Sequence, residues 1–162
     1  MKHPGTLIAV GLCGVGVATL LAEAVPQSSP EARTASHELS YHDHAPVGPL
    51  PSLLDARQFR VSRAAFVAYY LASQIKETLY QVPCYCPCNK SEGHQSLLDC
   101  FADKHGSKCV TCQREAVFCY LQTKEGRTPA EIRKAMERAE VQKIDWETEI
   151  DKALSRIPTE AR

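Results

Sequence analysis

Cysteines are concentrated in one part of this 162-residue chain. Of its eight cysteines, all but Cys13 lie between residues 84 and 119. Three of them alternate with other residues in the segment PCYCPC, two form a CVTC pair, and two stand apart: Cys84, Cys86, Cys88, Cys109, Cys112, Cys100 and Cys119. Thiolates at CxC and CxxC spacing close small chelate rings, and they select soft ions such as Cu(I) and Zn(II), or iron–sulfur clusters. This pattern favours a soft-metal site.

The number of cysteines bears on the choice of metal. A zinc ion would take four ligands, for instance two from PCYCPC and two from CVTC, and would leave at least three cysteines unused. A polynuclear Cu(I) site has bridging thiolates, so it would use six or seven cysteines together with a supporting histidine. We therefore expect Cu(I), with Zn(II) as the alternative. The candidate ligands are Cys84, Cys86, Cys88, Cys100, Cys109, Cys112, Cys119, His94 and His105.

Two other uses of the same thiols stay open. In an oxidising compartment, two or three disulfides could staple a small domain, although an odd number of cysteines leaves one thiol free or paired between chains. The CVTC pair also has the spacing of thiol–disulfide oxidoreductases, but the βαβ pattern expected around such a motif is absent. No Ser-His-Asp order, phosphate loop or carboxylate pair indicates a hydrolase. The sequence favours a binding protein over an enzyme.

Helices are expected to position these cysteines. Apolar residues recur at three- and four-residue spacing over 61–82, where Pro83 ends the pattern, and a second helix is expected over about 107–124 before Gly126. TPAE at 128–131 combines an N-cap, a proline at the first helical position and a capping-box glutamate. A last helix is expected over 146–157. The sequence thus predicts an all-α domain over 60–157, a small helical bundle with an irregular cysteine-rich loop from 83 to about 105.

The second of these helices would place three cysteines on one stripe. At about 100° per residue, Cys109, Cys112 and Cys119 fall on the same side of a helix. Cys119 would lie about 10.5 Å along the axis from Cys112, so it could join the site only through a cluster or another partner. Extended chain between Pro83 and Pro87 would aim alternate thiols at this stripe. We expect the loop to fold over the helix, with the two sets of thiols facing each other.

The N-terminal part of the chain has a different character. Residues 1–24 combine Lys2, an uninterrupted apolar run and Ala22-Glu23-Ala24, the pattern of an export signal peptide or an N-terminal membrane anchor. Residues 25–59 are rich in proline, serine and histidine, which predicts a disordered linker. Nineteen basic and nineteen acidic side chains cancel, so no nucleic-acid partner is indicated. We expect an extracytoplasmic protein, periplasmic or secreted, with a possible membrane tether.

Several short motifs follow one another in a set order. They are PCYCxC, GH at 93–94, DCF at 99–101, HG at 105–106, CVTCQREA at 109–116 and IR at 132–133. Together they resemble the bacterial exported proteins named for a Pro-Cys-Tyr-Cys-Gly-Cys motif, over about residues 65–135. The resemblance implies an exported, often membrane-tethered protein of unknown function. This chain departs from the motif at Pro87, where the family has glycine, and by the insert NKSEG before His94.

These observations predict a function. The chain is expected to bind a soft metal through a thiolate cluster and to serve in storage, detoxification or delivery to a cuproprotein or another extracytoplasmic protein. A disulfide-stapled interaction domain and a thiol–disulfide oxidoreductase are the alternatives.

Overall fold

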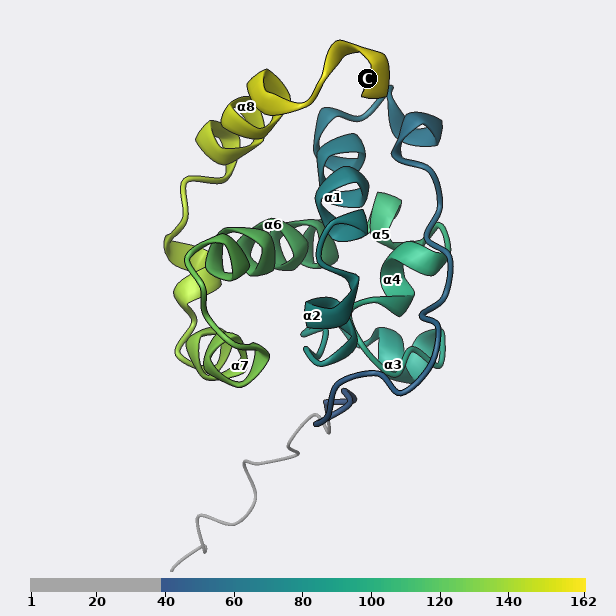
Figure 1. The fold of residues 1–162 in the computed structure, drawn as a ribbon, viewed down its shortest axis with the longest axis vertical. Coiled ribbons are helices and arrows are strands. Elements are labelled where there is room, and N and C mark those ends of the chain that lie inside the picture. The colour runs from purple at the N-terminus through teal and green to yellow at the C-terminus, as the bar shows by residue number, and fades with distance from the viewer. Residues whose placement is uncertain (1–38) are drawn as a thin grey trace, which may run out of the picture. The chain divides into compact units, whose positions relative to one another are not determined.

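The computed structural model describes residues 39–162. The expected signal peptide or anchor, and the first part of the expected linker, lie outside these residues. The described part is helical and contains no strand, which confirms the all-α prediction (Figure 1). Within it, no helix combines the length and apolar character needed to cross a bilayer. The α-helices are α1 (Arg63–Ser73), α2 (Lys76–Tyr80), α3 (Cys88–Ser91), α4 (Asp99–Ala102), α5 (His105–Lys108), α6 (Val110–Lys124), α7 (Pro129–Glu137) and α8 (Trp146–Arg156).

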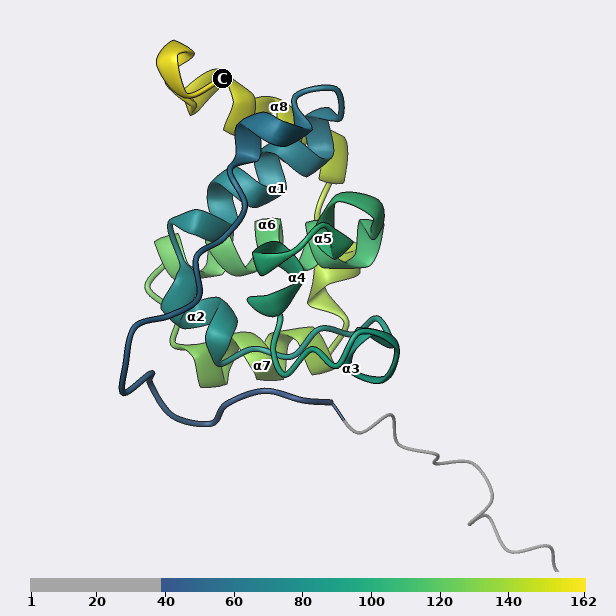
Figure 2. The same ribbon diagram turned by 90° about the vertical axis from the view of Figure 1, so that its right-hand side faces the viewer.

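The core is built where α1 crosses α6. The two helices run at a steep angle to each other, and α2, α4 and α5 lie around the crossing (Figures 1 and 2). Both helices are buried on more than one face, because consecutive residues, 65–69 in α1 and 115–119 in α6, all lie inside. The largest fully buried aromatic side chains are Tyr69, Phe101 and Phe118. Tyr69 of α1 meets Phe101 of α4 edge to face, with ring centroids 5.0 Å apart, so the core reaches the cysteine-rich region.

The helix expected over 61–82 is two helices. Ser62 caps the first through its side-chain oxygen, which accepts from the amide of Ala65 at 3.2 Å. The break falls at Gln74 and Ile75, where Ile75 has φ −133° and ψ 33°. Just before it, the hydroxyl of Ser73 donates to the carbonyl of Tyr70 at 2.7 Å. Such side-chain hydrogen bonds compete with the helical pattern, and they are hard to read from apolar spacing.

The C-terminal helices follow their sequence signals. Thr128 and Glu131 form the expected capping box: the Thr128 amide donates to Glu131 at 2.8 Å, and the Glu131 amide donates to the Thr128 hydroxyl at 3.4 Å. The helix ends before Ala139, which adopts the left-handed conformation at φ 57°. The 3₁₀ helix η3 (Glu140–Lys143) then leads to α8, which is capped by Asp145. Both predicted helices are confirmed.

The loop expected from 83 to about 105 contains short helices. Residues 83–109 include α3, α4 and α5, each only four residues long, separated by turns. Tertiary contacts hold them, because helices this short are unstable alone. One contact is a close approach at Gly106, where a Cβ atom would lie 2.7 Å from the Cys100 carbonyl oxygen. Only glycine lets α5 pack so tightly against α4.

The described part of the expected linker lies against the helices. The ring of His42 stacks on Tyr80 with centroids 3.8 Å apart, and the Leu54 amide donates to the Phe101 carbonyl at 3.0 Å. Leu53 and Leu54 pack on the core, and the 3₁₀ helix η2 (Ala56–Phe59) buries Ala56. This ordered packing departs from the disorder expected for residues 39–59. The sequence pattern did not predict this packing, because the leucines that contact the core are scattered and form no periodic pattern. The boundary drawn at residue 60 stays a prediction.

Candidate metal centre

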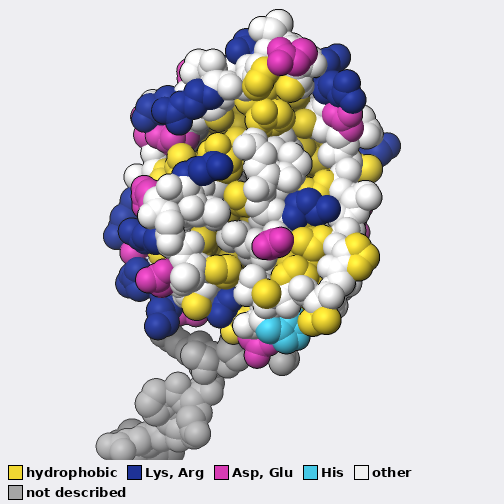
Figure 3. Space-filling model, viewed as in Figure 1, with side chains coloured by type: hydrophobic (Ala, Val, Ile, Leu, Met, Phe, Trp, Pro, Cys, Tyr) yellow, Lys and Arg dark blue, Asp and Glu magenta, His cyan; other side chains and the backbone are white. Residues whose placement is uncertain are grey.

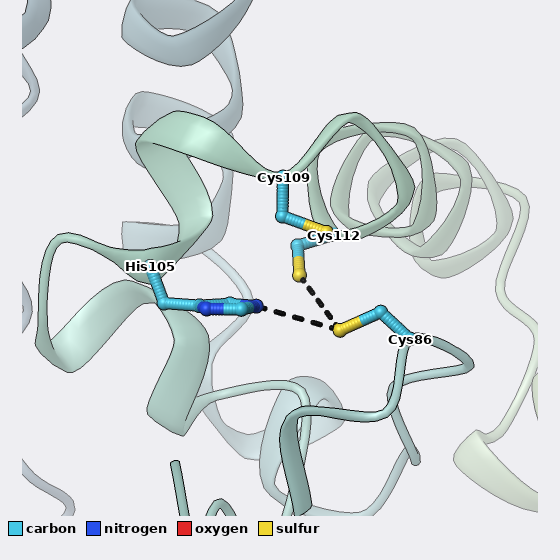
Figure 4. A group of neighbouring side chains, drawn as sticks. All are labelled: Cys86, His105, Cys109 and Cys112. Carbon is cyan, nitrogen blue, oxygen red and sulfur yellow. Dashed lines mark hydrogen bonds between the residues drawn. The ribbon is translucent and has the colours of Figure 1, made fainter. Parts of the chain in front are cut away.

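Four side chains from three segments meet beside the start of α6. Cys86 comes from the turn before α3, His105 from α5, and Cys109 and Cys112 from the start of α6; Figure 4 shows the four side chains converging. One ligand atom from each lies within 4.8 Å of the others. The Cys86 sulfur is 3.4 Å from His105 Nε2 and 3.6 Å from the Cys112 sulfur. Three thiols and one imidazole therefore form a possible metal-binding group, which we call the outer group.

The remaining PCYCPC cysteines form a second cluster with Cys100. The sulfur atoms of Cys84, Cys88 and Cys100 lie within 4.8 Å of one another, and all three side chains are buried. We call these residues the inner group. The Cys88 and Cys100 sulfurs are 3.6 Å apart. Cys84 also lies 3.4 Å from the sulfurs of Cys86 and Cys112, so the two groups touch.

The two sets of thiols therefore converge as expected, but the helical stripe is only partly correct. Cys109 is the N-cap of α6, with extended backbone at φ −108° and ψ 107°, rather than a residue inside the helix. Its side chain still turns toward Cys112, because a CxxC pair at a helix start brings the N-cap and third residue together. Cys119 does not reach either group: its sulfur lies 4.0 Å from the Met136 sulfur, in the core between α6 and α7.

The sulfur spacing suits a shared ion better than a covalent bond. A disulfide requires about 2.05 Å between sulfurs, and no pair among the seven cysteines of residues 39–162 is joined. Ligands about 2.3 Å from a tetrahedral ion lie ~3.8 Å from one another. The sulfur contacts within each group, Cys86–Cys112 and Cys88–Cys100, are both 3.6 Å and close to that edge length. The thiols are therefore nearly placed for coordination.

His94 reaches the inner group in spite of the insert before it. The inserted residues form most of α3, and Gly93 follows with φ 75°, a conformation that reverses the chain. The His94 amide then donates to the Cys88 carbonyl at 3.3 Å, and Nδ1 lies 3.3 Å from the Cys100 sulfur. The insert is thus a compact helical turn that returns His94 to the thiols.

Asp103 was not singled out by the sequence, yet it contacts both histidines. Its Oδ2 lies 3.0 Å from His94 Nε2, and its Oδ1 accepts from the backbone amide of His105 at 2.7 Å. Burial lowers the pKa of His94, but hydrogen bonds to Asp103 and Cys88 outweigh burial and raise that pKa overall. The sequence did contain a signal for this role, because Asp103 lies two residues before His105 and a carboxylate commonly orients a ligating imidazole.

Crowding separates the pKa values of the thiols. Hydrogen bonding with Cys100 lowers the pKa of Cys112 to about 6 and that of Cys84 to about 7. The partner thiol shows the opposite effect, since hydrogen bonds to Cys112 and Cys84 raise the pKa of Cys100. Burial raises the pKa of Cys86 as well. Without metal, Cys112 and Cys84 therefore lose their protons before Cys100 and Cys86, and binding an ion would release the remaining protons.

A buried carboxyl group adjoins the cluster. Glu115 of α6 is only 2% exposed, and its Oε1 accepts from the Tyr85 amide at 3.0 Å, which fixes the turn carrying Cys84 and Cys86. Burial, with the neighbouring Cys84 adding to it, raises the pKa of Glu115 well above its usual value. Sequence reasoning missed this residue, because a glutamate in a helix ordinarily faces solvent.

Replacing Glu115 by glutamine is expected to change how stability depends on pH. Above about pH 4.3 the unfolded glutamate ionises while the folded one keeps its proton, so the wild-type protein loses stability as pH rises toward the folded pKa. Glutamine does not titrate and can accept the same amide. Urea unfolding of reduced, metal-free protein from pH 5 to 8 measures this effect. The free energy of unfolding of the variant should rise relative to that of the wild type by at most about 1.4 kcal/mol per pH unit. Parallel curves, or an equal gain in the exposed control Glu147→Gln, would contradict this account.

Comparison with known proteins identifies a family and no individual relative. Residues 22–144 match the model of a family described as "protein of unknown function with PCYCGC motif". The match extends beyond residues 65–135, where the resemblance was seen, in both directions. No curated protein and no solved structure matches the chain.

Proposed function

The chain belongs to the family of proteins of unknown function with the PCYCGC motif, and we propose that it binds soft metal ions through its thiol cluster. The observation that carries this proposal is the outer group, in which Cys86, Cys109, Cys112 and His105 offer four ligand atoms within 4.8 Å of one another. Three sulfurs and one nitrogen are donors that hard ions such as Mg²⁺ and Ca²⁺ do not favour.

Cu(I) is the ion that we favour. Cys84 touches both Cys86 and Cys112, so the thiols form a connected set in which one sulfur can be shared between ions. Such sharing is how Cu(I) is held in polynuclear thiolate sites. Zn(II) is the second candidate, and the outer group favours it specifically, because three cysteines and one histidine form a common tetrahedral zinc set.

Storage, detoxification or delivery would follow from exchange among crowded thiols. Each contact of 3.4 to 3.6 Å places a further sulfur beside one already bound, so an ion can pass between ligands without becoming free. In this proposal the protein acts outside the cytoplasm, and the N-terminal segment exports or tethers it. The receiver is a cuproprotein or another extracytoplasmic protein. Basic and acidic side chains are interspersed on the face shown in Figure 3.

The two alternative functions have less support. A stapled domain needs disulfides, and the described cysteines are all free. An oxidoreductase needs a dithiol that a substrate can reach, but Cys112 is fully buried and surrounded by other thiols. Only Cys109 of the CxxC pair is partly exposed.

Metal analysis of anaerobically purified protein tests the proposal. We expect copper or zinc to co-purify, and we expect reduced apoprotein to show all seven thiols of residues 84–119 by titration under denaturing conditions. Competition between Cu(I) and Zn(II) for the apoprotein then identifies the preferred ion. Protein that carries two or three disulfides and takes up neither ion would refute metal binding. Turnover of a disulfide substrate with reversible CxxC oxidation would instead support the oxidoreductase.

A further inference from the structure

The inner group has the features of a second ion position. Cys84, Cys88 and Cys100 share no residue with the outer group, and each is at most 5% exposed. Cys88 comes from the start of α3 and Cys100 from α4, so two of these three thiols belong to elements that contribute nothing to the outer group. Three buried thiols within 4.8 Å of one another leave a tetrahedral ion one further ligand.

His94 is the candidate for that ligand, and it approaches the inner group from the Cys100 side. Its Nδ1 is 3.3 Å from the Cys100 sulfur, while Asp103 holds Nε2 at 3.0 Å. Nε2–H donates to the carboxylate in this arrangement, which leaves the Nδ1 lone pair directed at the thiols. A carboxylate on the far nitrogen is the usual companion of a metal-bound imidazole, because it fixes the tautomer and the ring orientation.

The outer group repeats this arrangement. His105 directs Nε2 to the Cys86 sulfur at 3.4 Å, and its other nitrogen, Nδ1, lies 4.0 Å from a carboxylate oxygen of Glu92. The two imidazole rings meet at 90° with centroids 5.2 Å apart. Each histidine therefore faces its own set of thiols and has a carboxylate behind it.

We propose that the cluster is binuclear, with one soft ion held by Cys86, Cys109, Cys112 and His105 and another by Cys84, Cys88, Cys100 and His94. This inference rests on the proposed function and adds the number of ions and their ligands. Charge is compatible with an ion in each group, because three thiolates and a neutral imidazole around one divalent ion leave a single negative charge. Cysteines of an unoccupied group can keep their protons, so the assignment rests on the geometry of the two groups.

Co(II) is a suitable probe, because tetrahedral thiolate coordination gives it intense visible and near-ultraviolet absorption. Anaerobic titration of reduced wild-type protein should saturate at about two equivalents. The double variants Cys88→Ser/Cys100→Ser and Cys86→Ser/Cys109→Ser should each saturate at about one, with helical content by circular dichroism as the check on folding. Cys119→Ser, which removes a thiol outside both groups, should keep two.

Milder variants decide the matter if a double variant does not fold. His94→Gln and His105→Gln leave every thiol in place, and each should weaken one of the two Co(II) steps about 10-fold or more and shift its absorption bands. Asp103→Asn should weaken the inner step alone, because the oxygen of the introduced carboxamide can still accept from the His105 backbone amide. Saturation of the wild type at one equivalent, or equal effects of His94→Gln and His105→Gln on a single step, would overturn the binuclear assignment. An absence of any Co(II), Zn(II) or Cu(I) binding would overturn the proposed function itself.

Discussion

Replacing Cys112 by serine is expected to cause the largest loss of metal affinity of any single substitution in this chain. Its sulfur touches Cys84 at 3.4 Å and Cys86 at 3.6 Å, so it contacts thiols of both groups. Cys86 has similar contacts, but burial raises its pKa, whereas the pKa of Cys112 is lowered to about 6, so Cys112 offers a metal ion a thiolate more readily. Loss of a residue that hydrogen bonds to a metal ligand typically lowers metal affinity about 10–100-fold. Loss of the ligand itself should lower it further. Competition with a chromophoric chelator measures the change.

Cys119→Ser provides a matched control for this experiment. Both cysteines lie on α6, both are fully buried, and each substitution puts a hydroxyl group in place of a thiol. The penalty of burying that hydroxyl, about 1–3 kcal/mol, should therefore be similar in the two variants. Only Cys112 adjoins the other thiols. Equal losses of metal affinity in the two variants would mean that general destabilisation, rather than coordination, explains the effect.

Removing the metal is expected to loosen residues 83–109 far more than the rest of the described chain. The helices α3, α4 and α5 are each one turn long, so they depend on tertiary contacts. Beyond the thiols, scattered hydrogen bonds attach this segment to longer helices; examples run from the Leu98 amide to the Leu79 carbonyl of α2 at 3.2 Å and from the Gln113 side chain of α6 to the Gly106 carbonyl at 2.9 Å. An ion at about 100 times its dissociation constant would stabilise the folded state by about 2.7 kcal/mol.

Hydrogen exchange with and without metal measures this effect by segment. Amides of residues 83–109 should gain protection on loading, whereas amides in the middle of α1 and α7, which contain no candidate ligand, should change only through global stability. The result should reverse on chelation under reducing conditions. A uniform change across all helices, or none in residues 83–109, would contradict a role for the metal in holding the loop.

Local signals explain which parts of the fold the sequence predicts well. The start of α7 was predictable because Thr128, Pro129 and Glu131 act within a single turn. The α1–α2 break was not, since it depends on the Ser73 hydroxyl and on how Ile75 packs. Four-residue helices such as α3 are also too short to show an apolar period, so the region was predicted as irregular.

The candidate site was predictable in composition but not in organisation. Spacing indicated that thiols from PCYCPC and CVTC would meet, and they do. It did not indicate that Cys109 would cap α6, or that Cys119 would face Met136, because both depend on where the helix begins and what covers it. Glu115 and Asp103 were missed for a related reason: their importance comes from what packs over them.

The two groups differ in how much of them reaches the surface. Cys84, Cys88 and Cys100 are at most 5% exposed, whereas His105 is 21% exposed and Cys109 is also partly exposed. A competing chelator or a docked acceptor protein can touch the exposed pair directly, but it reaches the inner sulfurs only when the chain opens. The centre should therefore have one labile and one inert occupant. In a pulse-chase with metal isotopes, this difference would appear as biphasic release, with the slow phase limited by local unfolding.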